Sequence, residues 1–242
     1  MLWWIISTLF AFFVKGLCGF ANTLVFTTLL SFENSNLNIS PIELLLGYPT
    51  NAILAWKDRK HINWRICIPL TLLVIGGSIP GILFLKNTEA GILKIFFGII
   101  IILIALEMVL RDFQKQKLKQ SSLVLGIIGV LSGLLCGLYG IGALLGAYIN
   151  RVTTDSHSFK ANLCFVFLIE NTIRIILYTL SGIISLHTLW QAVPLFPFMF
   201  LGLFLGIQSS KIIDDKVVKK LVLVLLLFSG AALIINNLSA FL

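Results

Sequence analysis

Three ionisable residues lie deep inside apolar stretches of this 242-residue chain: Lys15, Glu170 and Arg174. A charged group at the centre of a membrane segment costs at least about 2.5 kcal/mol to insert, so each is a candidate for function. Glu170 and Arg174 are four residues apart, which places them on one helical face. They form either a structural ion pair or a site for a substrate or a proton. If they pair exclusively, Lys15 remains an uncompensated cation, unless it extends to the membrane interface.

A further carboxylate, Glu43, has a structural explanation. The run Ser40-Pro41-Ile42-Glu43 has the spacing of a helix capping box with proline at the first helical position. Glu170 is therefore the carboxylate best placed to bind a proton within a membrane. No histidine relay is predicted there, because all three histidines fall in expected loops, at positions 61, 157 and 187.

The composition excludes a water-soluble protein. Hydrophobic residues make up 58% of the chain and charged residues 12%, whereas soluble domains carry about 25% charged residues. The outer solvent of the protein must therefore be lipid. The 18 Lys and Arg residues form short tracts between apolar segments, which is typical of membrane proteins rather than of nucleic-acid binding. The four cysteines lack metal-ligand spacing, so neither a metal nor a cofactor is predicted.

Two of the apolar segments are too long for a straight crossing. About 30 helical residues span about 45 Å, against a hydrocarbon core of about 30 Å. Both have glycine-rich middles, at 15–19 and 133–142, and glycine weakens helices and permits unusual backbone angles. We therefore predict two half-helices around a break in each, with close helix packing as the alternative role for glycine. The eight segments are approximately 2–32, 41–56, 66–85, 90–110, 121–150, 161–186, 188–210 and 218–242.

The two halves of the chain repeat each other. Cys18-Gly19 recurs as Cys136-Gly137, and Asn51 aligns with Asn171. A shift of 125 residues superposes Pro69 on Pro194, Gly77 on Gly202, Gly81 on Gly206, Lys86 on Lys211 and Lys94 on Lys219. We therefore predict a duplication, with one membrane repeat at 1–113, a cytoplasmic linker at 114–119 and a second repeat at 120–242.

The distribution of basic residues predicts how the halves lie. If all eight segments cross the membrane, each side receives eight basic residues and no orientation follows. If segments 2–32 and 121–150 enter and return on one side, the cytoplasmic loops hold 14 and the outside only Lys86 and Lys94. Each half then crosses three times, so the second half is inverted relative to the first. An inverted repeat of this kind places a site at the repeat interface near the midplane.

The predicted fold class is therefore an all-α polytopic membrane protein of two inverted repeats, each with about four apolar segments and a broken or re-entrant first segment. It is expected in the plasma (inner) membrane, with charged loops cytoplasmic and both termini outside. A lone buried cation near two half-helix N-termini favours an anion, because those ends carry partial positive charge. We predict anion binding by Lys15, Arg174 and the backbone N–H groups after Gly19 and Gly137. Three asparagines in apolar surroundings complete the predicted site, with hydrogen bonding between helices as the alternative: Asn22, Asn51 and Asn171.

With these features the sequence resembles the sulfite exporter TauE/SafE family of membrane proteins. The resemblance covers nearly the whole chain. It rests on the duplication, on the openings KGLCGF and SGLLCGLYGIG, and on the Pro…Gly…Gly helix at 69–81 and 194–206. The chain lacks the proline that usually follows each glycine-rich opening. The resemblance implies a carrier that exports a small anion such as sulfite, an organosulfonate or a small carboxylate.

The predicted function is thus a secondary transporter of a small anion, working by alternating access between the two halves. If transport is coupled to protons, Glu170 is the predicted carrier of the proton. An anion channel is one alternative. A membrane-embedded enzyme or assembly factor is another, although no HExxH, GxSxG or Cys/His arrangement and no Walker motif is present. We therefore predict no enzymatic activity, and the oligomeric state stays open.

Overall fold

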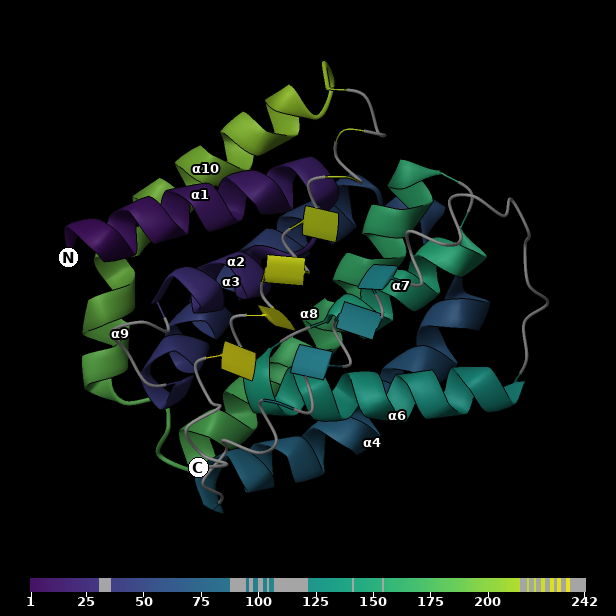
Figure 1. Ribbon diagram of the computed structural model, residues 1–242, viewed down its shortest axis with the longest axis horizontal. Coiled ribbons are helices and arrows are strands. Elements are labelled where there is room, and N and C mark those ends of the chain that lie inside the picture. The colour runs from purple at the N-terminus through teal and green to yellow at the C-terminus, as the bar shows by residue number, and fades with distance from the viewer. Residues whose placement is uncertain are drawn as a thin grey trace.

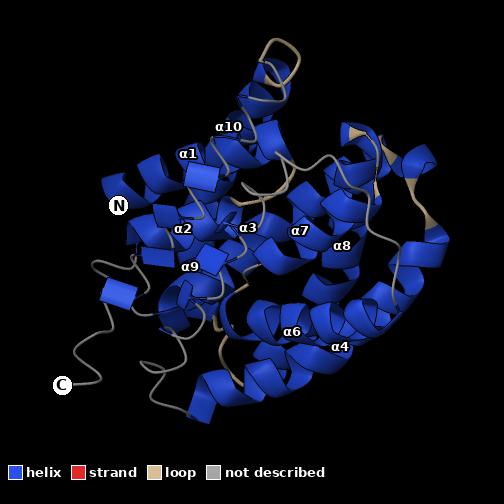
Figure 2. Cartoon of the chain, turned by 45° about the vertical axis from the view of Figure 1, so that its right-hand side comes forward, coloured by secondary structure: helices blue, strands red, loops and turns tan. Residues whose placement is uncertain are grey.

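A computed structural model of the chain is shown in Figures 1 and 2. It describes residues 1–30, 36–87, 122–140, 142–153 and 155–213, together with scattered residues between 95 and 106 and between 217 and 235. All regular structure in these ranges is helical, which confirms an all-α protein.

The first half contains α1 (Leu2–Cys18), α2 (Asn22–Leu30), α3 (Asn36–Lys57), the 3-10 helix η1 (Arg59–His61) and α4 (Trp64–Asn87). The second half contains α6 (Ser122–Tyr139), α7 (Ala143–Val152), α8 (Ser156–Leu180), α9 (Leu186–Ala192), the 3-10 helix η2 (Val193–Leu195) and α10 (Phe196–Ser209). The predicted linker at 114–119 lies outside the described residues.

The first long apolar segment is broken, as predicted, at a short turn after α1. Gly19 has φ +85° and Ala21 has φ +71°, so both lie in the left-handed region that ends a helix. The chain then folds back, because Trp3 near the start of α1 donates through Nε1 to the carbonyl of Leu29 near the end of α2, at 2.9 Å. The segment is therefore a helical hairpin and not one long helix.

The second long segment is broken between α6 and α7. Gly140 has φ +69°, so the chain turns at the C-terminal end of the glycine-rich stretch. Gly133 and Gly137 lie inside α6, where an added Cβ would meet the backbone of α4 at Val74 and Ser78. Both roles that the sequence left open for glycine are therefore used in this one stretch.

The outer surface of the bundle is apolar along its long helices. Three described helices are long and apolar enough to cross a membrane: Trp64–Leu83, Ser156–Leu180 and Leu186–Ser209. Their outward faces carry exposed rows of large apolar residues, which belong against lipid. On α4 these are Ile68, Leu72, Ile79 and Leu83, and on α10 they are Phe200, Leu201, Phe204 and Leu205.

Two helix pairs join the halves through glycine. α1 packs along α10, and α4 packs along α6 on the opposite side of the molecule (Figure 1). A Cβ added at Gly206 of α10 would lie 2.8 Å from the Cα of Gly16 on α1. One added at Gly81 of α4 would lie 3.2 Å from the Cα of Gly137 on α6. Each half therefore supplies one helix to each pair, and the backbones approach closely because neither helix has a side chain there.

Between these two pairs, α3 packs against α8 at the centre of the molecule (Figure 1). Hydrogen bonds tie the two helices together. The Ser40 hydroxyl lies 3.1 Å from the Tyr178 hydroxyl, and the Thr172 hydroxyl donates to the Tyr48 hydroxyl at 3.3 Å. Because α3 belongs to the first half and α8 to the second, polar side chains of both halves meet in the middle of the bundle.

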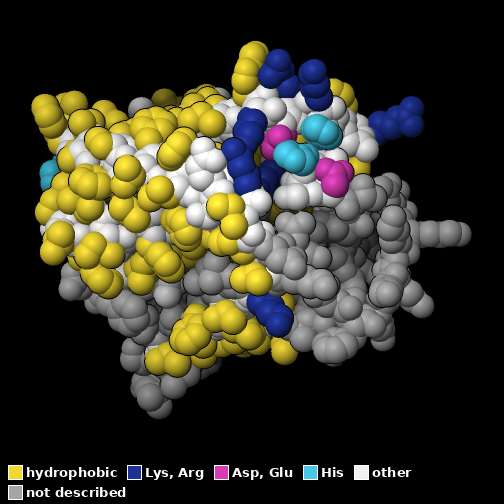
Figure 3. Space-filling model, turned by 90° about the horizontal axis from the view of Figure 1, so that it is seen from above, with side chains coloured by type: hydrophobic (Ala, Val, Ile, Leu, Met, Phe, Trp, Pro, Cys, Tyr) yellow, Lys and Arg dark blue, Asp and Glu magenta, His cyan; other side chains and the backbone are white. Residues whose placement is uncertain are grey.

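Described charged side chains gather where α3 ends and α8 begins (Figure 3). There Asp58 Oδ1 lies 2.9 Å from Nδ1 of His157, and the His157 ring stacks on that of His61 with 5.6 Å between centroids. The prediction that all histidines lie in loops is wrong for His157 and His187, which lie in the first turns of α8 and α9. Each of these helices begins a few residues before the apolar segment predicted from the sequence, at 161 or 188. The histidine therefore falls in the first turn of the helix. All three rings are exposed, so none lies inside the bundle.

Candidate functional site

A pocket lies between the two breaks, at the junction of the halves. Its walls come from the turn after α1, the turn after α6, and the helices α1, α2, α3 and α8. The empty space, including its open mouth, is about 390 Å³. The lining residues are Lys15, Phe20, Ala21, Asn22, Thr23, Leu24, Glu43, Asn51, Gly140, Gly142, Phe167 and Asn171.

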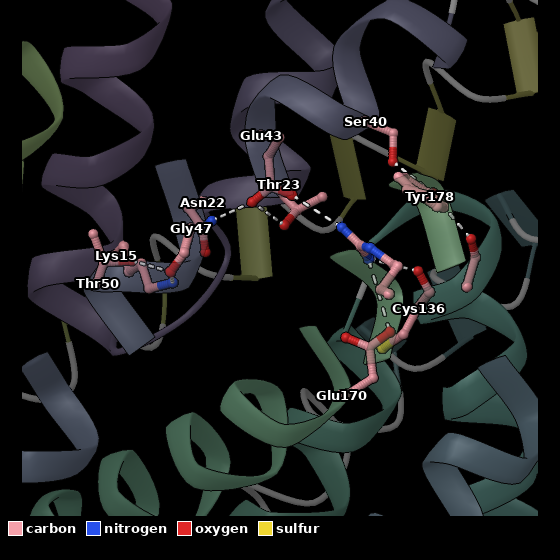
Figure 4. Close-up of polar contacts among 12 residues, drawn as sticks. Lys15, Asn22, Thr23, Ser40, Glu43, Gly47, Thr50, Cys136, Glu170 and Tyr178 are labelled. Carbon is pink, nitrogen blue, oxygen red and sulfur yellow. Dashed lines mark hydrogen bonds and ion pairs between the residues drawn. The ribbon is translucent and has the colours of Figure 1, made fainter. Parts of the chain in front are cut away.

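Glu43 of α3 points into this region, against the first turn of α2 (Figure 4). Its Oε1 accepts hydrogen bonds from Asn22 Nδ2 at 2.5 Å and from the Thr23 hydroxyl at 2.8 Å. The residue is 3% exposed. The N-terminal end of a helix favours negative charge, so Glu43 fills one of the two positions expected to attract an anion.

The capping box predicted at Glu43 is wrong. The helix α3 begins at Asn36, before Ser40, and Ser40 lies inside it with its hydroxyl beside that of Tyr178. Pro41 is also inside the helix. The polar residues before the apolar run extend α3 instead of starting it, and Glu43 is therefore a buried residue of the site.

Arg174 of α8 lies between two carboxylates. Its Nη2 is 3.5 Å from Oε2 of Glu43, and its Nη1 is 4.0 Å from Oε1 of Glu170. Nη1 also donates to the carbonyl of Cys136 at 2.7 Å. The absence of a side chain at Gly140 makes room for the guanidinium, since a Cβ there would lie 2.9 Å from both Nη atoms. The predicted pairing with Glu170 is therefore present but is not exclusive.

Of the two carboxylates, Glu170 has fewer hydrogen bonds within the described part of the chain. It is fully buried, and neither Oε1 nor Oε2 has a hydrogen-bond partner among the described residues. Among the described residues, the cationic group in ion-pair contact with it is the guanidinium of Arg174, beyond hydrogen-bonding distance. Figure 4 shows its carboxylate next to Cys136.

Lys15 of α1 is also buried, with 1% of its surface exposed. Its Nζ donates to the carbonyl of Gly47 at 3.5 Å, a long contact, and no carboxylate lies within ion-pair distance of it in the described part of the chain. The ammonium group lines the pocket. Lys15 does not extend to the surface, so it is a cation held at the pocket wall.

The three predicted asparagines all line the pocket. Asn22 comes from the start of α2, Asn51 from α3 and Asn171 from α8. Asn22 donates to Glu43, whereas Oδ1 of Asn51 is buried without a hydrogen-bond partner within the described ranges. Asn51 therefore retains an unused acceptor at the pocket.

The two predicted glycines occupy different positions. Gly19 lies in the first break, next to the pocket-lining Phe20, and a Cβ there would collide with the side chain of Lys160. Gly137 lies inside α6, and the Tyr178 hydroxyl donates to its carbonyl at 3.3 Å. The second break comes later, at Gly140, and Gly140 and Gly142 line the pocket in place of Gly137.

Sequence reasoning missed Glu43, Thr23 and the aromatic wall residue Phe167. A usable signal existed for Glu43: an acidic residue within an apolar segment near Gly47 is costly unless it is paired. Thr23 and Phe167 carry no signal in the sequence, because hydroxyls and aromatic rings are common in membrane helices.

A bundle of apolar helices with two broken helices around a buried, charged pocket has the organisation of a membrane transport protein. The family model described as Sulfite exporter TauE/SafE matches residues 4–233. This chain belongs to the sulfite exporter TauE/SafE family, as the resemblance predicted, and is a membrane transport protein. Neither a comparison with curated proteins nor one with solved structures gives a match.

Proposed function

We propose that this protein is a secondary carrier that exports a small anion, such as sulfite, an organosulfonate or a small carboxylate. The observation that carries the proposal is Lys15, a buried cation without an ion pair in the described chain, at the wall of a pocket between two broken helices. An anion in the pocket gains the charge of Lys15 and the N–H groups at the start of α7. Asn51 and Asn171 supply polar groups that orient it.

Alternating access requires two parts that move against each other around the pocket. We propose that these are the two repeats, 1–113 and 120–242, inverted relative to each other. Each of the pairs α1–α10 and α4–α6 takes one helix from each repeat. The two pairs support this division, because the contact of Gly206 with Gly16 resembles that of Gly81 with Gly137. Rocking of one repeat against the other would then open the pocket to each side in turn.

The proposed orientation in the inner membrane puts the end of α3 in the cytoplasm and the start of α9 outside. We expect an impermeant maleimide added to intact cells to label His187→Cys, and to label Lys60→Cys only after the membrane is opened. Both positions are exposed, and the four native cysteines are buried, so background labelling is low. Labelling of Lys60→Cys in intact cells, with His187→Cys protected, would reverse the orientation.

Replacing Lys15 tests the proposed binding site. In proteoliposomes, we expect wild-type protein to catalyse saturable counterflow of at least one anion from a panel of sulfite, sulfonates and small carboxylates. Lys15→Ala should reduce that counterflow by about tenfold or more, because a desolvated, charge-assisted hydrogen bond contributes about 1.5–3 kcal/mol. Lys15→Arg should retain part of it.

The matched control is Lys211→Ala, an exposed lysine in the turn after α10 whose Nζ donates to Oε1 of Gln208. This variant should transport like the wild type. Equal counterflow by Lys15→Ala and Lys211→Ala would remove Lys15 from the site. Anion flux that does not saturate and shows no counterflow would indicate a channel instead of a carrier.

A further inference from the structure

Four buried charges cancel one another: Lys15 and Glu43 at the pocket wall, and Arg174 and Glu170 in the ion pairs behind Glu43. Lys15 and Arg174 are cationic, and Glu43 and Glu170 are anionic when ionised. None of the four is more than 3% exposed. With all four ionised, the described centre of the protein has no net charge before an anion arrives.

An anion that enters this neutral centre brings an uncompensated negative charge into a site surrounded by apolar helices. Removing such a charge from water is strongly unfavourable unless it is balanced nearby. Lys15 attracts the anion, but its charge is already offset within the group by the two carboxylates. The balance is restored if one carboxylate takes up a proton when the anion binds.

The hydrogen bonds decide which carboxylate that is. Glu43 receives hydrogen bonds from Asn22 and Thr23 and pairs with Arg174, and all of these contacts favour its ionised form. Glu170 has no hydrogen-bond partner in the described chain, and its ion pair with Arg174 spans 4.0 Å. A proton on Glu170 therefore removes the weaker contact and leaves the Glu43–Arg174 pair in place.

The other groups that face Glu170 do not replace it in this role. Arg174 and Tyr178 lie on the same helix, Glu43 on α3 and Cys136 on α6. The thiol and the phenol are both uncharged at neutral pH. The charge next to Glu170 therefore comes from Arg174 and Glu43, which are paired with each other.

We infer that the carrier moves one proton together with each monovalent anion, and that Glu170 binds this proton. The inference rests on the proposed function. Both the empty state with Glu170 ionised and the loaded state with Glu170 protonated have no net charge, so transport is electroneutral. A divalent anion would leave one negative charge uncompensated, so the site selects singly charged forms. Outward transport then follows the anion gradient and removes one proton with each anion.

Net efflux from proteoliposomes tests this coupling with the purified full-length protein. The probe is methanesulfonate, which has one charge, compared with sulfoacetate, which has two. With methanesulfonate loaded inside, we expect the internal pH to rise as the anion leaves. The rate should not change when potassium and valinomycin impose a membrane potential, and sulfoacetate should be transported more slowly.

Failure of the inference and failure of the proposed function give different results. Saturable methanesulfonate counterflow, with net efflux that follows the membrane potential and leaves the internal pH constant, would overturn only the proton coupling. Absence of counterflow for every sulfite, sulfonate and carboxylate in the panel would overturn the carrier function and the inference with it.

Glu170→Gln is the matched variant, since glutamine resembles the protonated glutamate in shape and charge. Wild-type counterflow should decrease as the pH rises, because the protonated form of Glu170 is depleted. In Glu170→Gln the proton movement should be lost and counterflow should become independent of pH, whereas Glu170→Asp should keep both pH responses. Proton movement that persists in Glu170→Gln would contradict the assignment, and a normal size-exclusion profile of the variant would show that it is folded.

Discussion

Replacing Gly77 with alanine is expected to lower the thermal stability of the protein markedly, whereas the same change at the adjacent Gly76 should not. A Cβ at Gly77 would overlap the carbonyl oxygen of Val130 and lie 3.0 Å from the backbone nitrogen of Leu134, both on α6. These are backbone atoms, so the clash is relieved only if α4 and α6 move apart. Overpacking of this kind costs about 1–3 kcal/mol.

Gly76 is the matched control because it lies on the same helix with nothing within 4 Å of its Cβ position. Alanine there should be neutral or stabilise slightly, since it favours a helix over glycine by about 1 kcal/mol. Gly202 extends the test to the other pair, because a Cβ there would meet Leu9 and Phe13 of α1 in the same manner. Gly202→Ala should therefore be destabilised as much as Gly77→Ala.

The measurement is thermal unfolding in detergent, followed by loss of the monodisperse size-exclusion peak. A Gly77→Ala variant as stable as Gly76→Ala would mean that α4 and α6 do not approach as closely as the structure has them. Unequal effects at Gly77 and Gly202 would weaken the proposed equivalence of the two helix pairs.

The second large effect is expected from Arg174→Gln. The variant leaves Glu43 and Glu170 buried without their shared cation, and breaking a buried ion pair by removing one partner costs about 3–5 kcal/mol. We expect a strong decrease in folded yield and thermal stability. Arg59→Gln is the control, because Arg59 is exposed and its guanidinium lies over Trp56 at the surface.

A second substitution shows which carboxylate depends more on Arg174. Glu43 retains its hydrogen bonds from Asn22 and Thr23 without the arginine, whereas Glu170 retains none within the described chain. Adding Glu170→Gln to Arg174→Gln should therefore restore more stability than adding Glu43→Gln. The reverse order in thermal stability would show that Glu43 is the carboxylate with the greater need of compensation.

Much of the site was predictable because polar and charged groups are costly to place in a membrane and are therefore conspicuous within an apolar segment. A polar or charged residue within a long apolar run must be buried among helices or face a pocket. Lys15, Asn22, Asn51 and Asn171 were singled out for this reason, and all four line the pocket. The proximity of Glu170 to Arg174 was predictable as well, because helical spacing alone places residues four apart on one face.

Glu43 shows the limit of local patterns. Its motif is equally compatible with a helix start and with the interior of a longer helix, and neighbouring residues do not distinguish them. Only the packing of α3 against α2 and α8 brings Glu43 within 3.5 Å of Arg174. Since the energy of an ion pair depends on that distance and on burial, the sequence could not assign the pair.

The glycine residues show the same limit: the sequence predicts that a segment is broken, but not the exact position of the break. Composition and apolar length determined by themselves that the chain is a helical membrane protein, and the paired glycine-rich stretches determined that its two long segments are broken. The place of the second break, at Gly140 and not at Gly137, was decided by tertiary structure. Gly137 is held inside α6 because its missing side chain lets α4 approach, while Gly140 turns the chain with φ +69° beside the guanidinium of Arg174. A glycine suits either purpose equally well, so only its neighbours in space select one.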